Sequence, residues 1–203
     1  MNHNKIVLYI HGKGGSAAES RHYEALFPGW NVVGLSYTAS TPWEAKQEFS
    51  GAFDALVKPG DRVILIANSI GAYFSLISLA QKPIEAACFI SPIVDMEKLI
   101  QNMMIWAGVT EEELNARQKI ETTFGETLRW DYLTYVRNHP IQWNIPTSIL
   151  YGELDNLTDR TTIEGFSAAI GADLTVMPGG EHWFHTSRQM AFLDDWILSL
   201  QKA

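Results

Sequence analysis

The chain has 203 residues, 46% of them hydrophobic, which is enough for one folded domain with a substantial core. Its formal net charge is −8 and Lys and Arg form no cluster, so the sequence predicts no nucleic-acid partner. No segment reaches the roughly 20 apolar residues that span a bilayer, which predicts no membrane partner. The single cysteine, Cys88, cannot form an internal disulfide and lies in an apolar run, so we expect a reducing, cytoplasmic location.

Short β-branched apolar runs predict six strands, and the first of them is too short to be the apolar core of a signal peptide. These runs are Lys5–Ile10, Asn31–Ser36, Arg62–Ala67, Ala86–Ser91, Thr147–Tyr151 and Leu174–Met177. Helical patterns lie between or after them, at Ala17–Phe27, Trp43–Val57, Ile70–Gln81, Thr161–Ile170 and Ser187–Gln201. Most strands are continuously apolar, which is typical of parallel strands covered on both faces. We therefore predict a three-layer α/β fold with a mostly parallel, doubly wound sheet of about six strands.

One interval, Asp95–Trp143, interrupts this alternation, and we expect no strand in it. Apolar residues recur at helical spacing at its start, and Thr110 is placed to cap a second helix through Glu113. We therefore interpret residues 95–143 as a helical lid inserted into a single domain that spans residues 1–203.

The segment after the third predicted strand, Ala67-Asn68-Ser69-Ile70-Gly71, has the features of a nucleophile elbow. In such an elbow a serine occupies a strained strand-to-helix turn with its hydroxyl exposed. Small residues are required two positions before and after the serine, and Ala67 and Gly71 satisfy this requirement. The alternative interpretation is that Ser69 is an ordinary N-cap residue of the following helix.

The segment after the first strand, His11-Gly12-Lys13-Gly14-Gly15-Ser16, is a glycine-rich loop that lets the backbone approach a substrate oxygen. The N–H groups of Lys13 and Ile70 are therefore candidate oxyanion donors. A rival interpretation is a dinucleotide site, because Gly12-x-Gly14-x-x-Ala17 matches the loose fingerprint. That fingerprint also needs an acidic residue at the end of the second strand, where the sequence has Gly34-Leu35-Ser36-Tyr37.

Two further strands end in candidate members of a catalytic triad. Asp155 follows the fifth strand, where a carboxylate can fix the tautomer of an imidazole, and Asp95 after the fourth strand is the competing acid. Asp155 could instead cap the next helix, although Asp159 is better placed for that role.

The sixth strand is followed by Gly179-Gly180-Glu181-His182, which makes His182 the candidate base. His185 is the alternative base, and it also begins or precedes the last helix. A metal pair formed by His182 and His185 would lack a nearby third ligand, so we predict no metal site.

The order of glycine loop, serine elbow, acid and histidine resembles the α/β-hydrolase superfamily, whose triad runs Ser, acid, His along the chain. The resemblance covers the chain from His11 to the C-terminal helix, with the lid as the poorly matched part. Two departures are visible: alanine replaces the first glycine of the usual G-x-S-x-G, and no antiparallel strands precede the oxyanion-loop strand. The resemblance implies the α/β-hydrolase fold.

These residues predict a serine hydrolase that cleaves a small or medium carboxylic ester or thioester and needs no cofactor. Ser69 is the expected nucleophile, His182 the base and Asp155 the orienting acid. The expected partner is a small acyl substrate, and the sequence gives no signal for an oligomeric state. Two alternatives remain: a carbon–carbon hydrolase or lyase on the same triad, and a non-catalytic binding protein that reuses the fold.

The insert also suggests which substrate would fit. It carries many methionine and aromatic residues, namely Met96, Met103, Met104, Trp106, Phe124, Trp130, Tyr132 and Tyr135. Such side chains adapt to apolar shapes, so the sequence predicts a preference for uncharged, apolar acyl groups. The alternative is that they only fasten the insert to the body of the protein.

Overall fold

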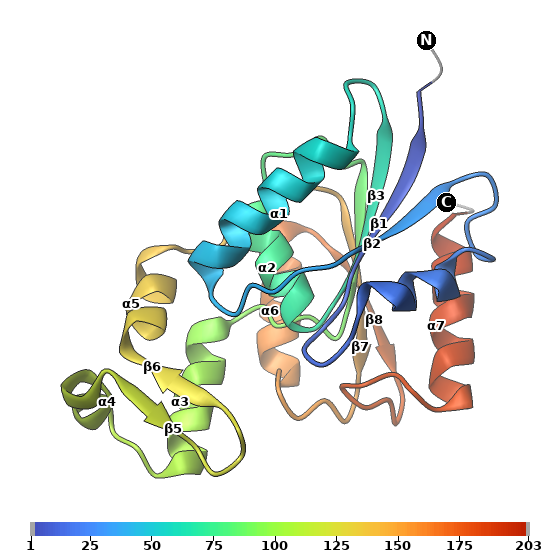
Figure 1. Ribbon diagram of the computed structural model, residues 1–203. Coiled ribbons are helices and arrows are strands. Elements are labelled where there is room, and N and C mark those ends of the chain that lie inside the picture. The colour runs from blue at the N-terminus through green and yellow to red at the C-terminus, as the bar shows by residue number, and fades with distance from the viewer. Residues whose placement is uncertain (1–2, 202–203) are drawn as a thin grey trace. The chain divides into compact units, whose positions relative to one another are not determined.

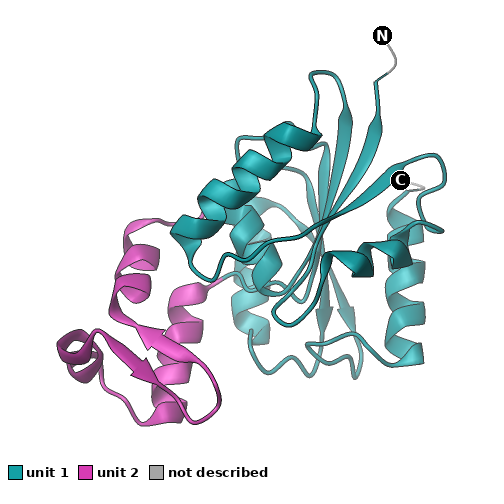
Figure 2. Ribbon diagram, viewed as in Figure 1, with its two compact units in different colours: residues 1–94, 142–203 teal, residues 95–141 magenta. Residues whose placement is uncertain are grey.

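The computed structural model describes residues 3–201, which form two compact units (Figure 2). Unit 1 contains the described residues up to position 94 and those from position 142 onward. Unit 2 is the continuous segment Asp95–Ile141. The predicted insert and unit 2 therefore begin at the same residue and end within two residues of each other.

Unit 1 is built on a six-stranded sheet with the order β2-β1-β3-β4-β7-β8. Its strands are β1 (Lys5–Ile10), β2 (Asn31–Leu35), β3 (Arg62–Asn68), β4 (Ala86–Ile90), β7 (Thr147–Gly152) and β8 (Asp173–Met177). Every neighbouring pair is parallel. The predicted parallel sheet is confirmed, and each strand end lies within one residue of its predicted position, because continuous apolar runs mark buried parallel strands clearly.

Helices cover both faces of this sheet and complete the three layers (Figure 1). One face carries α1 (Pro42–Leu56), α2 (Ile70–Ser78) and α6 (Arg160–Ile170), and the other carries η1 (Ala17–Tyr23) and α7 (Ser187–Leu200). On the η1 and α7 side, a buried cluster that includes Tyr9, Tyr23, Ile66 and Trp196 forms the core.

The helix predicted over residues 17–27 is shorter than expected, since η1 is a 3₁₀ helix that ends at Tyr23. Its start is specified by a capping box formed by Ser16 and Glu19. Pro28 disfavours a helical backbone at Phe27, the last residue of the predicted helix. The apolar spacing that suggested a longer helix instead serves the packing of Tyr23 and Phe27 into the core.

Unit 2 contains three helices, α3 (Met96–Ala107), α4 (Glu111–Arg117) and α5 (Trp130–Asn138). The prediction that Thr110 caps a helix is confirmed, because its hydroxyl accepts a hydrogen bond from the Glu113 N–H at 3.2 Å. The expectation of no strand is wrong, because β5 (Lys119–Glu121) and β6 (Thr127–Arg129) form a small antiparallel hairpin. Three residues per strand, each with one buried central residue, are too few to show an alternating pattern in the sequence.

An arginine ties the helices of unit 2 together. The guanidinium of Arg137 on α5 donates to Glu97 on α3 at 2.7 Å and to both carboxylate oxygens of Glu111 on α4 at 2.6 and 2.8 Å. The fork of an arginine can hold two carboxylates in a fixed geometry, which a lysine cannot do. No helix in residues 3–201 has the length and apolar character needed to cross a membrane.

The contact between β2 and η1 provides a test of the packing in unit 1. A Cβ atom added at Gly34 would overlap the backbone carbonyl of Ala17, and backbone cannot move aside as a side chain can. We expect Gly34→Ala to lower the free energy of unfolding by about 3 kcal/mol. Gly51 on α1 is the matched control: a Cβ there meets no atom within 4 Å, so Gly51→Ala should stabilise the helix by roughly 0.8 kcal/mol. Urea unfolding followed by circular dichroism measures both changes, and equal effects of the two substitutions would contradict this packing.

Candidate active site

The predicted site residues of unit 1 lie in loops that leave the sheet at one edge. The strands β1, β3, β7 and β8 are parallel to their neighbours, so their carboxyl ends face the same way. The loops that follow them carry Lys13, Ser69, Asp155 and His182 in turn. Ligands and catalytic groups gather at this edge in open α/β sheets.

Ser69 occupies the turn between β3 and α2 with a strained backbone. Its φ is 51° and its ψ is −121°, a region that a residue with a Cβ atom rarely adopts. The N–H of Ser69 donates to the carbonyl of Ile90 at 3.0 Å, and its own carbonyl accepts from the N–H of Ile93 at 3.2 Å. The side chain makes no capping hydrogen bond to α2, unlike that of an ordinary N-cap serine.

Small residues around Ser69 permit close approach of the backbone. A Cβ atom on Gly71 would overlap the carbonyl oxygen of His11, and a Cβ on Gly12 would lie 3.2 Å from the Cβ of Ser69. Ala67 is completely buried. The steric reason for a small residue at position 71 is therefore present in the structure.

A continuous chain of hydrogen bonds joins the serine, the histidine and the acid. The Oγ of Ser69 lies 2.8 Å from Nε2 of His182, and Nδ1 of the same imidazole lies 2.7 Å from Oδ2 of Asp155. The side chain of Asp155 is 0% exposed and that of His182 is 15% exposed. The imidazole thus lies between a buried carboxylate and a partly accessible hydroxyl.

The surroundings of Asp155 determine which nitrogen of His182 carries the proton. The second oxygen of Asp155 accepts hydrogen bonds from the backbone N–H groups of Leu157 at 2.8 Å and Thr158 at 3.0 Å. An ionised carboxylate only accepts, so Nδ1 of a neutral His182 must donate to it. The lone pair of Nε2 then faces Ser69 and is free to accept the hydroxyl proton.

Close backbone contact holds the acid loop against the histidine loop. The N–H of Leu154 donates to the carbonyl of Gly180 at 2.7 Å, and the N–H of Gly179 donates to the Glu153 carboxylate at 2.8 Å. A Cβ on Gly152 would overlap the carbonyl oxygen of Glu181. Glycine at position 152 therefore allows the two loops to approach closely enough for the acid to reach the imidazole.

The glycine loop after β1 is held by its own hydrogen bonds. The carbonyl of Gly12 accepts from the N–H of Gly15 at 3.1 Å and from Nδ1 of His11 at 2.8 Å. The ring of His11 stacks on Tyr37 with centroids 4.3 Å apart, and the Tyr37 hydroxyl donates to the carbonyl of His11 at 2.8 Å. Burial raises the pKa of Tyr37 to about 12, so this hydroxyl stays a donor at neutral pH.

The other two ionisable candidates make different contacts. Asp95 caps α3 in unit 2, where its carboxylate accepts from the N–H of Lys98 at 2.9 Å. The Nδ1 of His185 lies 2.7 Å from the carbonyl of Trp183, and the two rings stack with centroids 4.3 Å apart. Within residues 3–201, no group of three or more His, Cys, Asp or Glu side chains could hold a metal ion.

Comparison with known proteins bears on the fold. No protein-family model and no curated protein sequence matches the chain. Alpha/beta hydrolase domain-containing protein 10 from mouse matches with a TM-score of 0.74 and 15% identity, over 97% of this chain and 89% of its own. Est1E from Butyrivibrio proteoclasticus matches with a TM-score of 0.74 and 15% identity, over 98% of this chain and 88% of its own. The esterase domain of a Rhodothermus marinus protein matches with a TM-score of 0.66 and 14% identity, over 97% of this chain and 86% of its own. The chain has the α/β-hydrolase fold.

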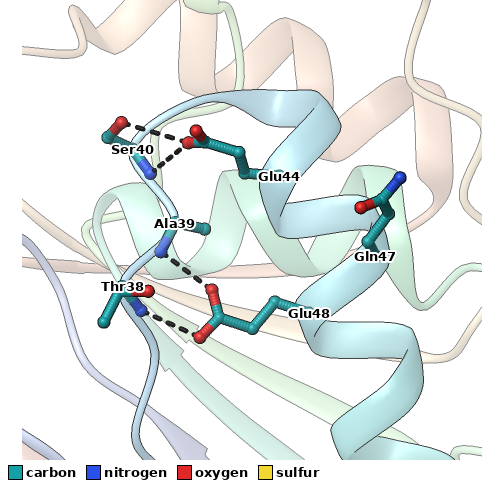
Figure 3. A pocket seen from close by; sticks show the side chains of 6 residues that line it. All are labelled: Thr38, Ala39, Ser40, Glu44, Gln47 and Glu48. Atoms are coloured by element: carbon teal, nitrogen blue, oxygen red, sulfur yellow. Dashed lines mark hydrogen bonds between the residues drawn. The ribbon is translucent and has the colours of Figure 1, made fainter.

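One surface pocket is lined by none of the predicted site residues (Figure 3). It has a volume of about 470 Å³ and is lined by Thr38, Ala39, Ser40, Glu44, Gln47 and Glu48. The Glu48 carboxylate accepts from the N–H groups of Thr38 and Ala39 at 2.9 Å, and Glu44 accepts from that of Ser40 at 3.0 Å. The two carboxylates thus hold the segment after β2 against α1, so their role in the structure is to stabilise this connection.

The side chains that hold the glycine loop have no role assigned from the sequence. The contact of His11 with the Gly12 carbonyl depends on a side-chain rotamer, which no sequence pattern reveals. The capping box of Ser16 and Glu19 does carry a recognisable signal, because its Ser-x-x-Glu spacing is visible in the sequence.

The ring nitrogen of His182 that carries the proton can be identified directly. In Asp155→Asn, the amide oxygen should still accept hydrogen bonds from the N–H groups of Leu157 and Thr158. The amide NH₂ must then face Nδ1 of His182. We expect the proton of neutral His182 to move from Nδ1 in the wild type to Nε2 in the variant. ¹⁵N NMR of the imidazole measures this change, with His185 as the internal control that should not change. Retention of Nδ1–H in the variant would contradict the hydrogen-bond directions described here.

Proposed function

We propose that the protein is a serine hydrolase that cleaves a small or medium carboxylic ester or thioester through an acyl-enzyme on Ser69. The observation that carries the proposal is the hydrogen-bonded chain from Ser69 through His182 to Asp155, which starts at a strained turn. Strained serines with an aligned base occur where a hydroxyl must be exposed and activated. A protein that only binds ligands has no need of this arrangement.

In the proposed reaction, Ser69 Oγ attacks the acyl carbonyl carbon while Nε2 of His182 takes the hydroxyl proton. The Asp155 carboxylate stabilises the imidazolium that forms. His182 then gives its proton to the leaving alcohol or thiol as the bond from the carbonyl carbon to the leaving group breaks. Water, deprotonated by the same imidazole, attacks the carbonyl carbon of the acyl-enzyme. The imidazolium then returns the proton to Ser69 Oγ as the bond from the carbonyl carbon to Oγ breaks and the acid is released.

The backbone N–H groups of Lys13 and Ile70 are the proposed donors to the oxyanion. Ile70 is the first residue of α2, where a backbone N–H has no acceptor within the helix and lies at the positive end of the dipole. The N–H of Lys13 and the carbonyl of Gly12 belong to one trans peptide and point in opposite directions. Because His11 and Gly15 hold that carbonyl, they also fix the direction of the Lys13 N–H.

This reaction needs no metal and no organic cofactor, and its partner is a small acyl substrate. The esterase domain among the solved structures with the same fold supports an ester as the substrate class. A carbon–carbon hydrolase would use the same three side chains, and only a screen of both substrate classes separates it from an esterase.

Substitution of the three proposed catalytic residues tests this mechanism. We expect Ser69→Ala and His182→Ala each to lower kcat for p-nitrophenyl butyrate by about 10⁴-fold or more, because each removes a group that acts in the transition state. Asp155→Asn should lower kcat by a similar order, since it imposes the wrong tautomer on His182.

The matched controls are His185→Ala and Asp95→Asn, which change residues of the same types that lie outside the hydrogen-bonded chain. Both should keep kcat within about threefold of the wild type. A greater loss in Asp95→Asn than in Asp155→Asn would move the acid to the loop after β4, and full activity of Ser69→Ala would overturn the proposal.

We further propose that the acyl group is uncharged and apolar. On unit 1, Leu154 and Trp183 are the neighbours of Asp155 and His182 in the chain, and they are 62% and 71% exposed. On unit 2, Ile105, Trp106 and Phe124 are exposed apolar residues. The net charge of −8 disfavours anionic substrates. As part of the same proposal, the insert acts as the lid that the sequence predicts.

A series of p-nitrophenyl esters from acetate to decanoate tests the acyl preference. Each additional buried methylene should raise kcat/KM about fourfold until the binding site is full, since it contributes about 0.8 kcal/mol. An anionic hemisuccinate ester is the control for charge, and we expect it to react more slowly than the butyrate. A flat profile, or a preference for the hemisuccinate, would contradict an apolar acyl site.

A further inference from the structure

A second chain of hydrogen bonds lies beside the nucleophile, and the proposed mechanism does not use it. The hydroxyl of Tyr9 on β1 donates to the Glu19 carboxylate on η1 at 2.5 Å. The amide Nδ2 of Asn68, the residue before Ser69, donates to the same hydroxyl oxygen at 3.0 Å. The other carboxylate oxygen of Glu19 accepts from the N–H of Ser16 at 2.9 Å.

The chemistry of these groups determines the direction of each bond. An ionised carboxylate only accepts, so Tyr9 must donate its single proton to Glu19, and its oxygen is left to accept from Asn68. Burial, and then the hydrogen bond to Glu19, raises the pKa of Tyr9 far above its usual range, so the hydroxyl keeps its proton. The Oδ1 of Asn68 is buried and has no hydrogen-bond partner within residues 3–201. The bond to Tyr9 is therefore what orients the Asn68 amide.

The location of Tyr9 argues that its hydroxyl has a specific task. The residue is 1% exposed and packs in the apolar cluster with Tyr23, Phe27 and Trp196. A phenylalanine would fill the same space without the cost of burying a hydroxyl. The hydroxyl is satisfied only because it bridges Glu19 and Asn68.

This chain joins both ends of the glycine loop to the elbow. Tyr9 lies two residues before His11, where the loop begins, and Ser16 ends the loop. Both form hydrogen bonds to the Glu19 carboxylate, and Tyr9 also accepts a hydrogen bond from Asn68, the residue that precedes Ser69. The loop that carries the Lys13 N–H and the turn that carries Ser69 therefore share one set of hydrogen bonds.

We infer that Tyr9 and Glu19 are positioning residues that hold the glycine loop, residues 11–16, in register with Ser69. They touch no reacting atom and act through the loop and through Asn68. The inference rests on the proposed function, since the register matters for catalysis only if Lys13 helps to bind an oxyanion. A displacement of this loop relative to Ser69 weakens binding of the transition state more than binding of the substrate.

The test compares Tyr9→Phe with Tyr23→Phe. Tyr23 is the matched control, because it is 3% exposed and its ring lies 5.2 Å from that of Tyr9, but it takes no part in the hydrogen bonds to Glu19 and Asn68. We expect Tyr9→Phe to lower kcat about tenfold with KM changed less than twofold, and to weaken binding of a trifluoromethyl ketone, which forms a tetrahedral adduct, by a similar factor. Tyr23→Phe should leave all three quantities within about twofold.

A second pair of variants tests the other end of the chain. Glu19→Ala removes both acceptors and should lower kcat about tenfold. Glu19→Gln should recover most of that loss, because its amide can accept from Ser16 and donate to Tyr9. The Tyr9 hydroxyl then donates to Asn68, whose amide turns over so that Oδ1 rather than Nδ2 faces it. The double variant Tyr9→Phe/Glu19→Ala should be little worse than either single variant, since the two residues act as one unit.

Hydrogen exchange separates this inference from the proposed function. The amides of residues 12–16 should exchange faster in Tyr9→Phe than in Tyr23→Phe, whether or not the protein hydrolyses esters. Wild-type protein without esterase activity would overturn the proposed function, while faster exchange in that loop would still support the positioning role. An active wild type whose Tyr9→Phe variant keeps its kcat and its exchange rates would overturn the positioning role.

Discussion

The backbone of Ser69 bends at a φ of 51°, and the contacts that stabilise this bend determine where the other groups of the site lie. Such a conformation costs about 1–3 kcal/mol and persists only where the surroundings over-determine it. Here the hydrogen bonds to Ile90 and Ile93 hold the turn from the β4 side, while the close approach of Gly71 to His11 holds it from the β1 side. The serine hydroxyl is thereby directed to His182 rather than to the N-terminus of its own helix.

Glycines play a second role in the same site by letting backbones touch. The acid loop and the histidine loop meet at Gly152 and Gly180, which lie on neighbouring strands or just after them. Their contact brings Oδ2 of Asp155 within 2.7 Å of Nδ1 of His182, although the two residues are 27 positions apart in the chain. A larger residue at position 152 would separate the loops, so the geometry of the side chains depends on the absence of one Cβ atom.

Much of this arrangement follows from the sequence, because its signals are strong where burial is complete. The six strands are predictable from continuous apolar runs, and the parallel order then places Ser69, Asp155 and His182 at one edge. The β5 and β6 hairpin was not predictable, since each strand has a single buried residue, Ile120 or Leu128. The end of η1 is also not predictable, because apolar spacing equally suits a turn that packs Phe27 into the core. The bridge from Glu19 through Tyr9 to Asn68 could not be foreseen, because it joins three elements through side-chain positions that only the folded chain defines.

The central claim is that the hydrogen-bonded chain makes Ser69 nucleophilic, and covalent labelling tests it without any assumption about the substrate. The protein would be treated with a fluorophosphonate, and the modified peptide would be located by mass spectrometry. We expect one adduct per chain, on the hydroxyl of Ser69. The absence of an adduct on the folded protein, or an adduct on a different serine, would contradict the account.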